Sequence, residues 1–151
     1  MSRQLHLSPR DEIVETMIAL ARFSKSSRIV LGGSGSTELF LELSRRGYTF
    51  GSIASSRPTS AGQFSMGLIF GDRAYDAIET SIDLIEKRLC SAAGIVIAIN
   101  SDQPSLAGKI RLKLERMGFR IEAGARCHDG FVMAARREER GRRQSAVPMA
   151  A

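Results

Sequence analysis

The chain has 151 residues, of which 43% are hydrophobic and 25% charged, and its 22 Lys and Arg against 16 Asp and Glu give a formal net charge of +6. This length and composition are typical of one globular domain with its own core, and they exclude a pair of full-size domains. The longest apolar run, 92–99, is too short to span a bilayer, and residues 1–12 hold no apolar signal core. We therefore expect a cytoplasmic protein without a membrane segment.

The cysteine content and the distribution of charge bear on two further classes. Two cysteines and two histidines are too few for a disulfide framework or a four-ligand zinc site, so we expect no metal. Segment 136–143 holds five Arg and two Glu, so half of the net charge of +6 lies near the C-terminus. Because aromatic residues do not interleave with the basic ones, we do not expect nucleic acid as a partner. A small-molecule substrate is a separate expectation, which does not follow from the charge.

The first half of the chain predicts two helices and three strands. Ser8 and Pro9 are typical of a helix start, and apolar residues follow them at helical spacing. A β-branched run that ends in glycines and a helical pattern that stops at Gly47 then indicate a strand, a glycine turn and a helix. The predicted elements are a helix over 9–23, a strand over 28–32, a helix over 37–46, a strand over 48–54, a loop over 55–62 and a strand over 65–70.

The second half predicts two helices and three strands. Apolar residues recur every three or four positions over 73–89, whereas the continuous apolar run 94–100 is typical of a strand covered on both faces. The predicted elements are a helix over 73–89, a strand over 94–100, a helix from 104 or 105 to 118, and strands over 119–125 and 131–136 around the tight turn Asp129-Gly130. This order predicts an α/β doubly wound sheet that closes with an antiparallel hairpin, in one domain over 1–137 with a disordered Arg-rich tail over 138–151.

A glycine-rich turn after the first predicted strand is the main candidate site. Residues 32–37 read Gly-Gly-Ser-Gly-Ser-Thr, and glycines there let a ligand approach the backbone closely. The helix that follows offers free N–H groups to a polar or anionic ligand, and doubly wound sheets bind ligands at this edge. The sequence therefore predicts a nucleotide-type site, with a purely structural turn as the alternative.

The arrangement resembles the class I S-adenosylmethionine-dependent methyltransferases over roughly residues 13–137. Segment 29–35 is similar to the first motif of that superfamily, and segment 68–75 is similar to its fourth strand. The closing hairpin, with one antiparallel strand in a parallel sheet, is similar as well. The resemblance implies a Rossmann-like methyltransferase fold of about six strands and four helices, in a small, divergent or truncated member. It also implies S-adenosylmethionine as cofactor, held by Gly33, Ser34, Gly35, Ser36 and Asp72, and methyl transfer to an unidentified substrate.

Three departures from the family pattern keep an alternative open. Leu31 stands where the family usually has an acidic residue, and segment 51–56 lacks the second acid, which binds the ribose hydroxyls. The connection after the second strand is too short for the usual helix and strand, so one outer strand is missing. A non-catalytic relative that acts as a binding or oligomerisation protein is therefore the alternative, and a second subunit could cover the exposed sheet edge in a homodimer.

The remaining polar candidates each have two interpretations. Asp72 lies just past a strand end and is the one candidate catalytic residue, as a base or a substrate contact; the alternative is that Asp72 caps a helix that begins at Arg73. The Asn-Ser-Asp sequence at 100–102 either lines the same cleft or forms a turn. The Cys-His-Asp sequence at 127–129 is expected to form neither a triad nor a metal site, because consecutive turn residues point in different directions.

A reductase-like domain that binds NADP is the second alternative. Arg57 follows the second predicted strand, where NADP-binding proteins place an arginine for the 2′-phosphate, and segment 30–35 is similar to a short-chain reductase start. The third glycine of that fingerprint would fall at Glu38, whose carboxylate opposes a pyrophosphate.

Overall fold

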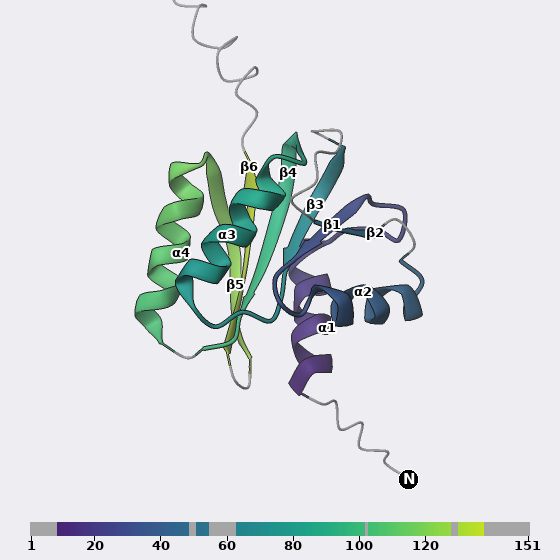
Figure 1. Ribbon diagram of the computed structural model, residues 1–151, viewed down its shortest axis with the longest axis horizontal. Coiled ribbons are helices and arrows are strands. Elements are labelled where there is room, and N and C mark those ends of the chain that lie inside the picture. The colour runs from purple at the N-terminus through teal and green to yellow at the C-terminus, as the bar shows by residue number, and fades with distance from the viewer. Residues whose placement is uncertain (1–8, 49–50, 55–62, 102, 128–129, 138–151) are drawn as a thin grey trace, which may run out of the picture.

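The computed structural model describes residues 9–48, 51–54, 63–101, 103–127 and 130–137, in which six strands and four helices are present (Figure 1). In chain order the elements are α1 (Pro9–Ala21), β1 (Ile29–Gly32), α2 (Ser36–Arg45), β2 (Gly51–Ile53), β3 (Phe64–Ile69), α3 (Tyr75–Glu86), β4 (Leu89–Ile99), α4 (Pro104–Arg116), β5 (Phe119–Cys127) and β6 (Gly130–Arg137). None of the helices in this described part is long and apolar enough to cross a membrane.

All six strands form one mixed sheet in the order β2-β1-β3-β4-β6-β5. The strands from β2 to β4 are parallel, and β6 lies antiparallel between β4 and β5. Gly130 begins β6 at a point where β6 lies very close to the end of β4, since a Cβ atom at Gly130 would lie 2.1 Å from the carbonyl oxygen of Ile99. The α/β sheet with a closing antiparallel hairpin is therefore confirmed.

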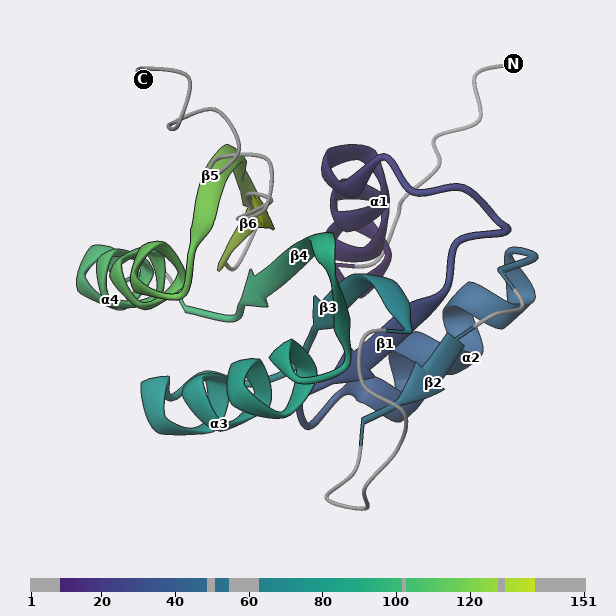
Figure 2. The same ribbon diagram turned by 90° about the horizontal axis from the view of Figure 1, so that it is seen from above.

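Helices cover both faces of this sheet (Figure 2). One apolar cluster joins α1 and α2 to one face, and the other joins α3 and α4 to the opposite face. In α3 the side chains of Ile78, Ile82 and Ile85 are fully buried, which follows from their helical spacing. All four residues of β1 are buried, as expected of a parallel strand with a helix layer on each side.

The boundary between α3 and β4 differs from the prediction. The helical pattern over 73–89 predicts one helix, but α3 ends at Glu86 and Leu89 already belongs to β4. Leu89 is buried in the same apolar cluster as α3. Its spacing therefore continues the helical pattern, although the residue belongs to the strand. Segment 91–92 is exposed, which explains why β4 seemed to begin only at Gly94.

The sheet edge at β2 is short and partly open. This strand has three residues, and Ile53 is 40% exposed. The described residues contain no strand between β2 and β3, while the loop predicted over 55–62 lies outside the described residues, as does the tail predicted over 138–151. The domain limits therefore stay a prediction.

Candidate functional site

Two loops meet at the carboxyl edge of the sheet, one after β1 and one after β3. We call residues 33–36 the glycine loop and residues 70–72 the β3 loop. The Gly35 N–H donates to the carbonyl oxygen of Phe70 at 2.8 Å, and the Ser36 N–H donates to Gly33 within its own loop at 3.1 Å. The predicted convergence of segment 33–36 with Asp72 thus appears in the structure as direct contact between the two loops.

The glycines of both loops have space for hydrogen atoms only. Gly33 and Gly71 have φ angles of +98° and +104°, which strain any residue with a side chain. A Cβ atom at Gly33 would lie 2.4 Å from the carbonyl oxygen of Phe70, and one at Gly71 would lie 2.4 Å from the nitrogen of Gly35. A Cβ atom at Gly35 would lie 2.6 Å from the ring of Phe70. Packing of one loop on the other therefore accounts for these glycines without a ligand.

Asp72 joins the β3 loop to both the glycine loop and α3. Its side chain is buried, and one carboxylate oxygen accepts from the Ser34 N–H at 3.2 Å, while the other accepts a longer hydrogen bond from the Ser81 hydroxyl at 3.5 Å. The interpretation of Asp72 as a helix cap is wrong, because α3 begins at Tyr75 and its N-cap residue is Ala74, without a side-chain cap. Instead, the Asp72 carboxylate accepts a hydrogen bond from the N–H of Ser34, which is 38 positions away in the sequence.

We expect Asp72→Ala to lower the free energy of unfolding by about 1.5–3 kcal/mol, the usual contribution of a hydrogen bond to a charged group. Asp72→Asn is expected to cost less, about 1 kcal/mol, because its amide oxygen can still accept from the Ser34 N–H. Urea unfolding followed by circular dichroism measures both, since the chain has no tryptophan. Equal losses in the two variants would show that charge, rather than the acceptor at Ser34, stabilises the loop.

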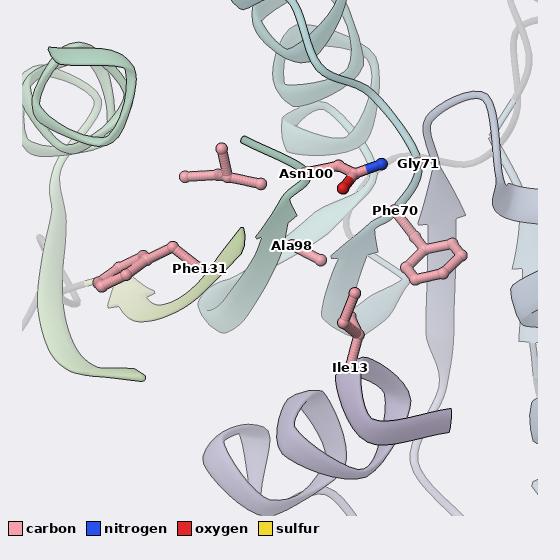
Figure 3. A pocket seen from close by; sticks show the side chains of 7 residues that line it. Ile13, Phe70, Gly71, Ala98, Asn100 and Phe131 are labelled. Atoms are coloured by element: carbon pink, nitrogen blue, oxygen red, sulfur yellow. The ribbon is translucent and has the colours of Figure 1, made fainter. Parts of the chain in front are cut away.

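A hollow opens beside the two loops, on the side of α1 (Figure 3). Its volume, counted out to the open mouth and so including solvent space, is about 290 Å³. Apolar groups dominate its walls, and one amide side chain adds a donor and an acceptor. The lining residues are Ile13, Phe70, Gly71, Ala98, Ile99, Asn100 and Phe131. None of these described lining residues carries a charge.

The other polar candidates divide between the hollow and ordinary turn chemistry. Asn100 lines the hollow, whereas the Ser101 hydroxyl accepts from the Gln103 N–H at 3.2 Å, which is turn chemistry.

Burial and the neighbouring carboxylate of Glu79 raise the pKa of Tyr75, whose hydroxyl donates to Glu79 at 3.3 Å. This phenol therefore stays protonated at neutral pH and cannot serve as a general base.

Several predicted candidates lie outside the described residues, namely Arg57, Asp102, His128 and Asp129. Within the described ranges no group of three or more His, Cys, Asp or Glu side chains could hold a metal ion. Leu31, at the position of the expected first acid, is completely buried in the sheet. The structure brings together all five residues predicted to bind the cofactor, and the hydrogen bonds that they make are with one another and with other residues of the protein, among them Phe70 and Ser81.

The sequence interpretation missed Phe70, Ser81 and Ile13 as parts of the site. Phe70-Gly71 follows a buried strand, and a glycine directly after a strand end is itself a sign of close backbone approach. Ile13 was assigned to the apolar face of a helix, and only the tertiary structure places it in the hollow with Phe70 and Ala98. No local pattern indicated Ser81, which lies on α3 with a buried side chain.

Solved methyltransferase structures are similar to this fold. The precorrin-6y C5,15-methyltransferase of Geobacter metallireducens GS-15 has a TM-score of 0.61 at 14% identity, over 91% of this chain and 94% of that one. The 1,6-didemethyltoxoflavin-N1-methyltransferase of Burkholderia thailandensis, solved with its substrate and S-adenosylhomocysteine, has a TM-score of 0.57 at 14% identity, over 86% of this chain and 78% of that one. A putative hemolysin of Lactococcus lactis has a TM-score of 0.65 at 9% identity, over 90% and 91%.

No protein-family model and no curated protein matches the sequence of this chain. At identities this low, the likeness to solved structures is one of fold. The chain has the class I methyltransferase-like fold, which the sequence resemblance predicted.

Proposed function

We propose that this chain is an S-adenosylmethionine-dependent methyltransferase, with its cofactor site between the glycine loop and the hollow. The observation that carries the proposal is the position of the hollow, at the carboxyl ends of β3 and β4 and beside the glycine loop. Open α/β sheets bind their ligands at this edge, close to where the strand order reverses. The fold is that of proteins among which one was solved with bound S-adenosylhomocysteine.

The residues present fit one end of this cofactor. Asp72 offers a buried carboxylate beside the glycine loop, and a carboxylate has about four acceptor positions, so two hydrogen bonds leave capacity for a ligand ammonium group. The hollow offers apolar walls and the Asn100 amide to an acceptor molecule. Bound there, the cofactor would supply a sulfonium methyl group for in-line displacement. The protein would contribute mainly by positioning the acceptor and excluding water.

A non-catalytic protein of the same fold is the second candidate, and the hydrogen bonds of the glycine loop favour it. The N–H groups of Ser34, Gly35 and Ser36 all donate to acceptors of the protein itself. In addition, Leu31 occupies the position at which the family usually has an acidic residue that holds the cofactor. In this reading the glycine loop stabilises the fold, and the protein would act through binding partners.

The reductase-like alternative has less support from the geometry. The phosphates of NADP would face the carboxylate of Asp72 at the glycine loop, and Glu38 adds a second carboxylate in the first turn of α2. Like charges at this position oppose a bound pyrophosphate.

Calorimetric titration of the full chain with S-adenosylmethionine and S-adenosylhomocysteine tests the proposal. We expect both to bind, and we expect Asp72→Asn to bind S-adenosylmethionine about tenfold more weakly, because the ammonium group loses a charged partner. Absence of binding at about 1 mM of either ligand, which corresponds to a free energy near −4 kcal/mol, would reject the methyltransferase and leave the non-catalytic protein. Binding of NADPH instead would support the reductase.

A further inference from the structure

We infer that Phe70 determines how far a ligand enters the site, because its ring occupies the space above Gly35 that a cofactor would need. The inference rests on the proposed function and adds a specificity-determining residue to it. Glycine at this point of a doubly wound fold leaves the backbone open to a ligand. Here the open face of Gly35 is covered by a side chain of the same protein.

The contact between the ring and Gly35 is direct. A Cβ atom at Gly35 would lie 2.6 Å from Cδ2 and 3.0 Å from Cε2 of Phe70. Phe70 is 7% exposed, so its ring is nearly closed off from solvent. The ring thus occupies the side of Gly35 to which a Cβ atom would point.

The backbone of Phe70 is fixed by hydrogen bonds, whereas its ring is held only by apolar packing, in the core cluster that joins α1 and α2 to the sheet. The Phe70 N–H donates to Gly32 at 3.0 Å, and its carbonyl oxygen accepts from Gly35 at 2.8 Å, so both backbone groups bind the segment that follows β1. A change in the side-chain rotamer would therefore uncover Gly35 without separating the two loops. Rotamer changes of this kind are common when ligands bind.

The ring also separates the glycine loop from the hollow. Phe70, Ile13 and Ala98 all line the hollow (Figure 3). The hollow alone does not reach the glycine loop, because none of its lining residues belongs to segment 33–36. Displacement of the ring would join this hollow to the space above Gly35, and the combined space would admit a larger ligand.

Calorimetric titration with S-adenosylhomocysteine, using Phe70→Leu and Phe70→Ala, tests the inference. We expect both variants to bind about tenfold more tightly than the wild-type protein, because no ring has to leave Gly35 before the ligand enters. Phe64→Leu is the matched control, since Phe64 lies at the other end of β3 with a similar exposure of 9%, and its affinity is expected to stay unchanged. Circular dichroism confirms folding, and Phe70→Leu keeps an apolar side chain in case the alanine variant does not fold.

A second measurement follows the ring itself. In the free wild-type protein, nuclear Overhauser contacts are expected between the Phe70 ring and the Gly35 Hα atoms, and they should disappear when S-adenosylhomocysteine binds. Tight binding with these contacts intact, or unchanged affinity in both Phe70 variants, would overturn the inference and leave the proposed function standing. Absence of binding in the wild-type protein and in both folded variants would instead reject the proposed function and the inference together.

Discussion

Replacing Gly71 with alanine is expected to lower the free energy of unfolding by about 2–5 kcal/mol, a large share of the roughly 5–15 kcal/mol that stabilises an ordinary domain. The φ angle of +104° costs about 1–2 kcal/mol for a residue with a side chain. The added methyl group would also lie 2.4 Å from the nitrogen and 2.8 Å from the Cα atom of Gly35. Because both are backbone atoms of the glycine loop, the clash is relieved only if the two loops separate.

Gly118→Ala is the matched control for this experiment. Gly118 follows α4 with a φ angle of +93°, and nothing lies within 4 Å of the position of its Cβ atom. The control therefore carries the backbone strain alone, about 1–2 kcal/mol. Urea unfolding of both variants separates the two effects. Equal losses at Gly71 and Gly118 would show that the loops are not packed as tightly as the structure indicates.

This comparison bears on the meaning of the glycine-rich turn. If Gly71→Ala is far more damaging than its control, then the glycines are needed by the fold, whether or not a ligand binds. For the same reason, substitution of Gly35 is a poor test of cofactor binding, because a side chain there meets the Phe70 ring before any ligand does. Asp72 and Phe70 are better positions for such tests, since conservative variants keep the backbone unchanged.

The elements with strong patterns were predictable from the sequence. Ile78, Ile82 and Ile85 fix the buried face of α3, and the apolar run at 94–99 identifies β4 as a strand covered on both sides. The antiparallel hairpin followed from the tight-turn sequence Asp129-Gly130 between two strand-like segments. These features depend on neighbours close in sequence, so short-range periodicity is enough to identify them.

The contacts within the site were not predictable in the same way. Ser34 and Asp72 are 38 positions apart, and nothing near Asp72 indicates that a distant N–H would claim its carboxylate. The local sequence favours a helix cap at Asp72, but in the structure its carboxylate accepts a hydrogen bond from a residue distant in the sequence. Likewise, Phe70 reads as the last residue of a buried strand, and only the tertiary structure reveals that its ring covers Gly35.

The count of charges does not distinguish Arg137 from its basic neighbours. Arg137 is the last residue of the predicted domain over 1–137 and the second of the basic segment 136–143. In the structure its side chain is only 16% exposed and bonds to Glu86 at 2.6 Å and to the carbonyl oxygens of Leu89 and Cys90 at 3.0 and 2.9 Å. Its guanidinium also lies 5.3 Å from the ring centroid of Phe119. Arg137 therefore joins the end of β6 to the α3–β4 connection.

Arg137→Met is accordingly expected to lower the free energy of unfolding by about 2–4 kcal/mol. Methionine keeps much of the apolar length, so the loss reports the three hydrogen bonds. It would leave two carbonyl oxygens without the partner that they have in the structure. The expected loss of unfolding free energy is smaller than the full cost of breaking a buried ion pair, because the Glu86 side chain is 33% exposed and can be hydrated.

The neighbouring residue supplies the control. Arg136 is 45% exposed, donates to Ala92 at 3.1 Å and lies 3.8 Å from Glu122, so Arg136→Met is expected to cost less than about 1 kcal/mol. Both variants remove one positive charge at adjacent positions, and a difference between them in urea unfolding therefore reflects burial and hydrogen bonding rather than net charge. Similar losses would mean that Arg137 behaves as surface charge after all. A large loss at Arg137 alone would show that its side chain belongs to the packed structure of the domain.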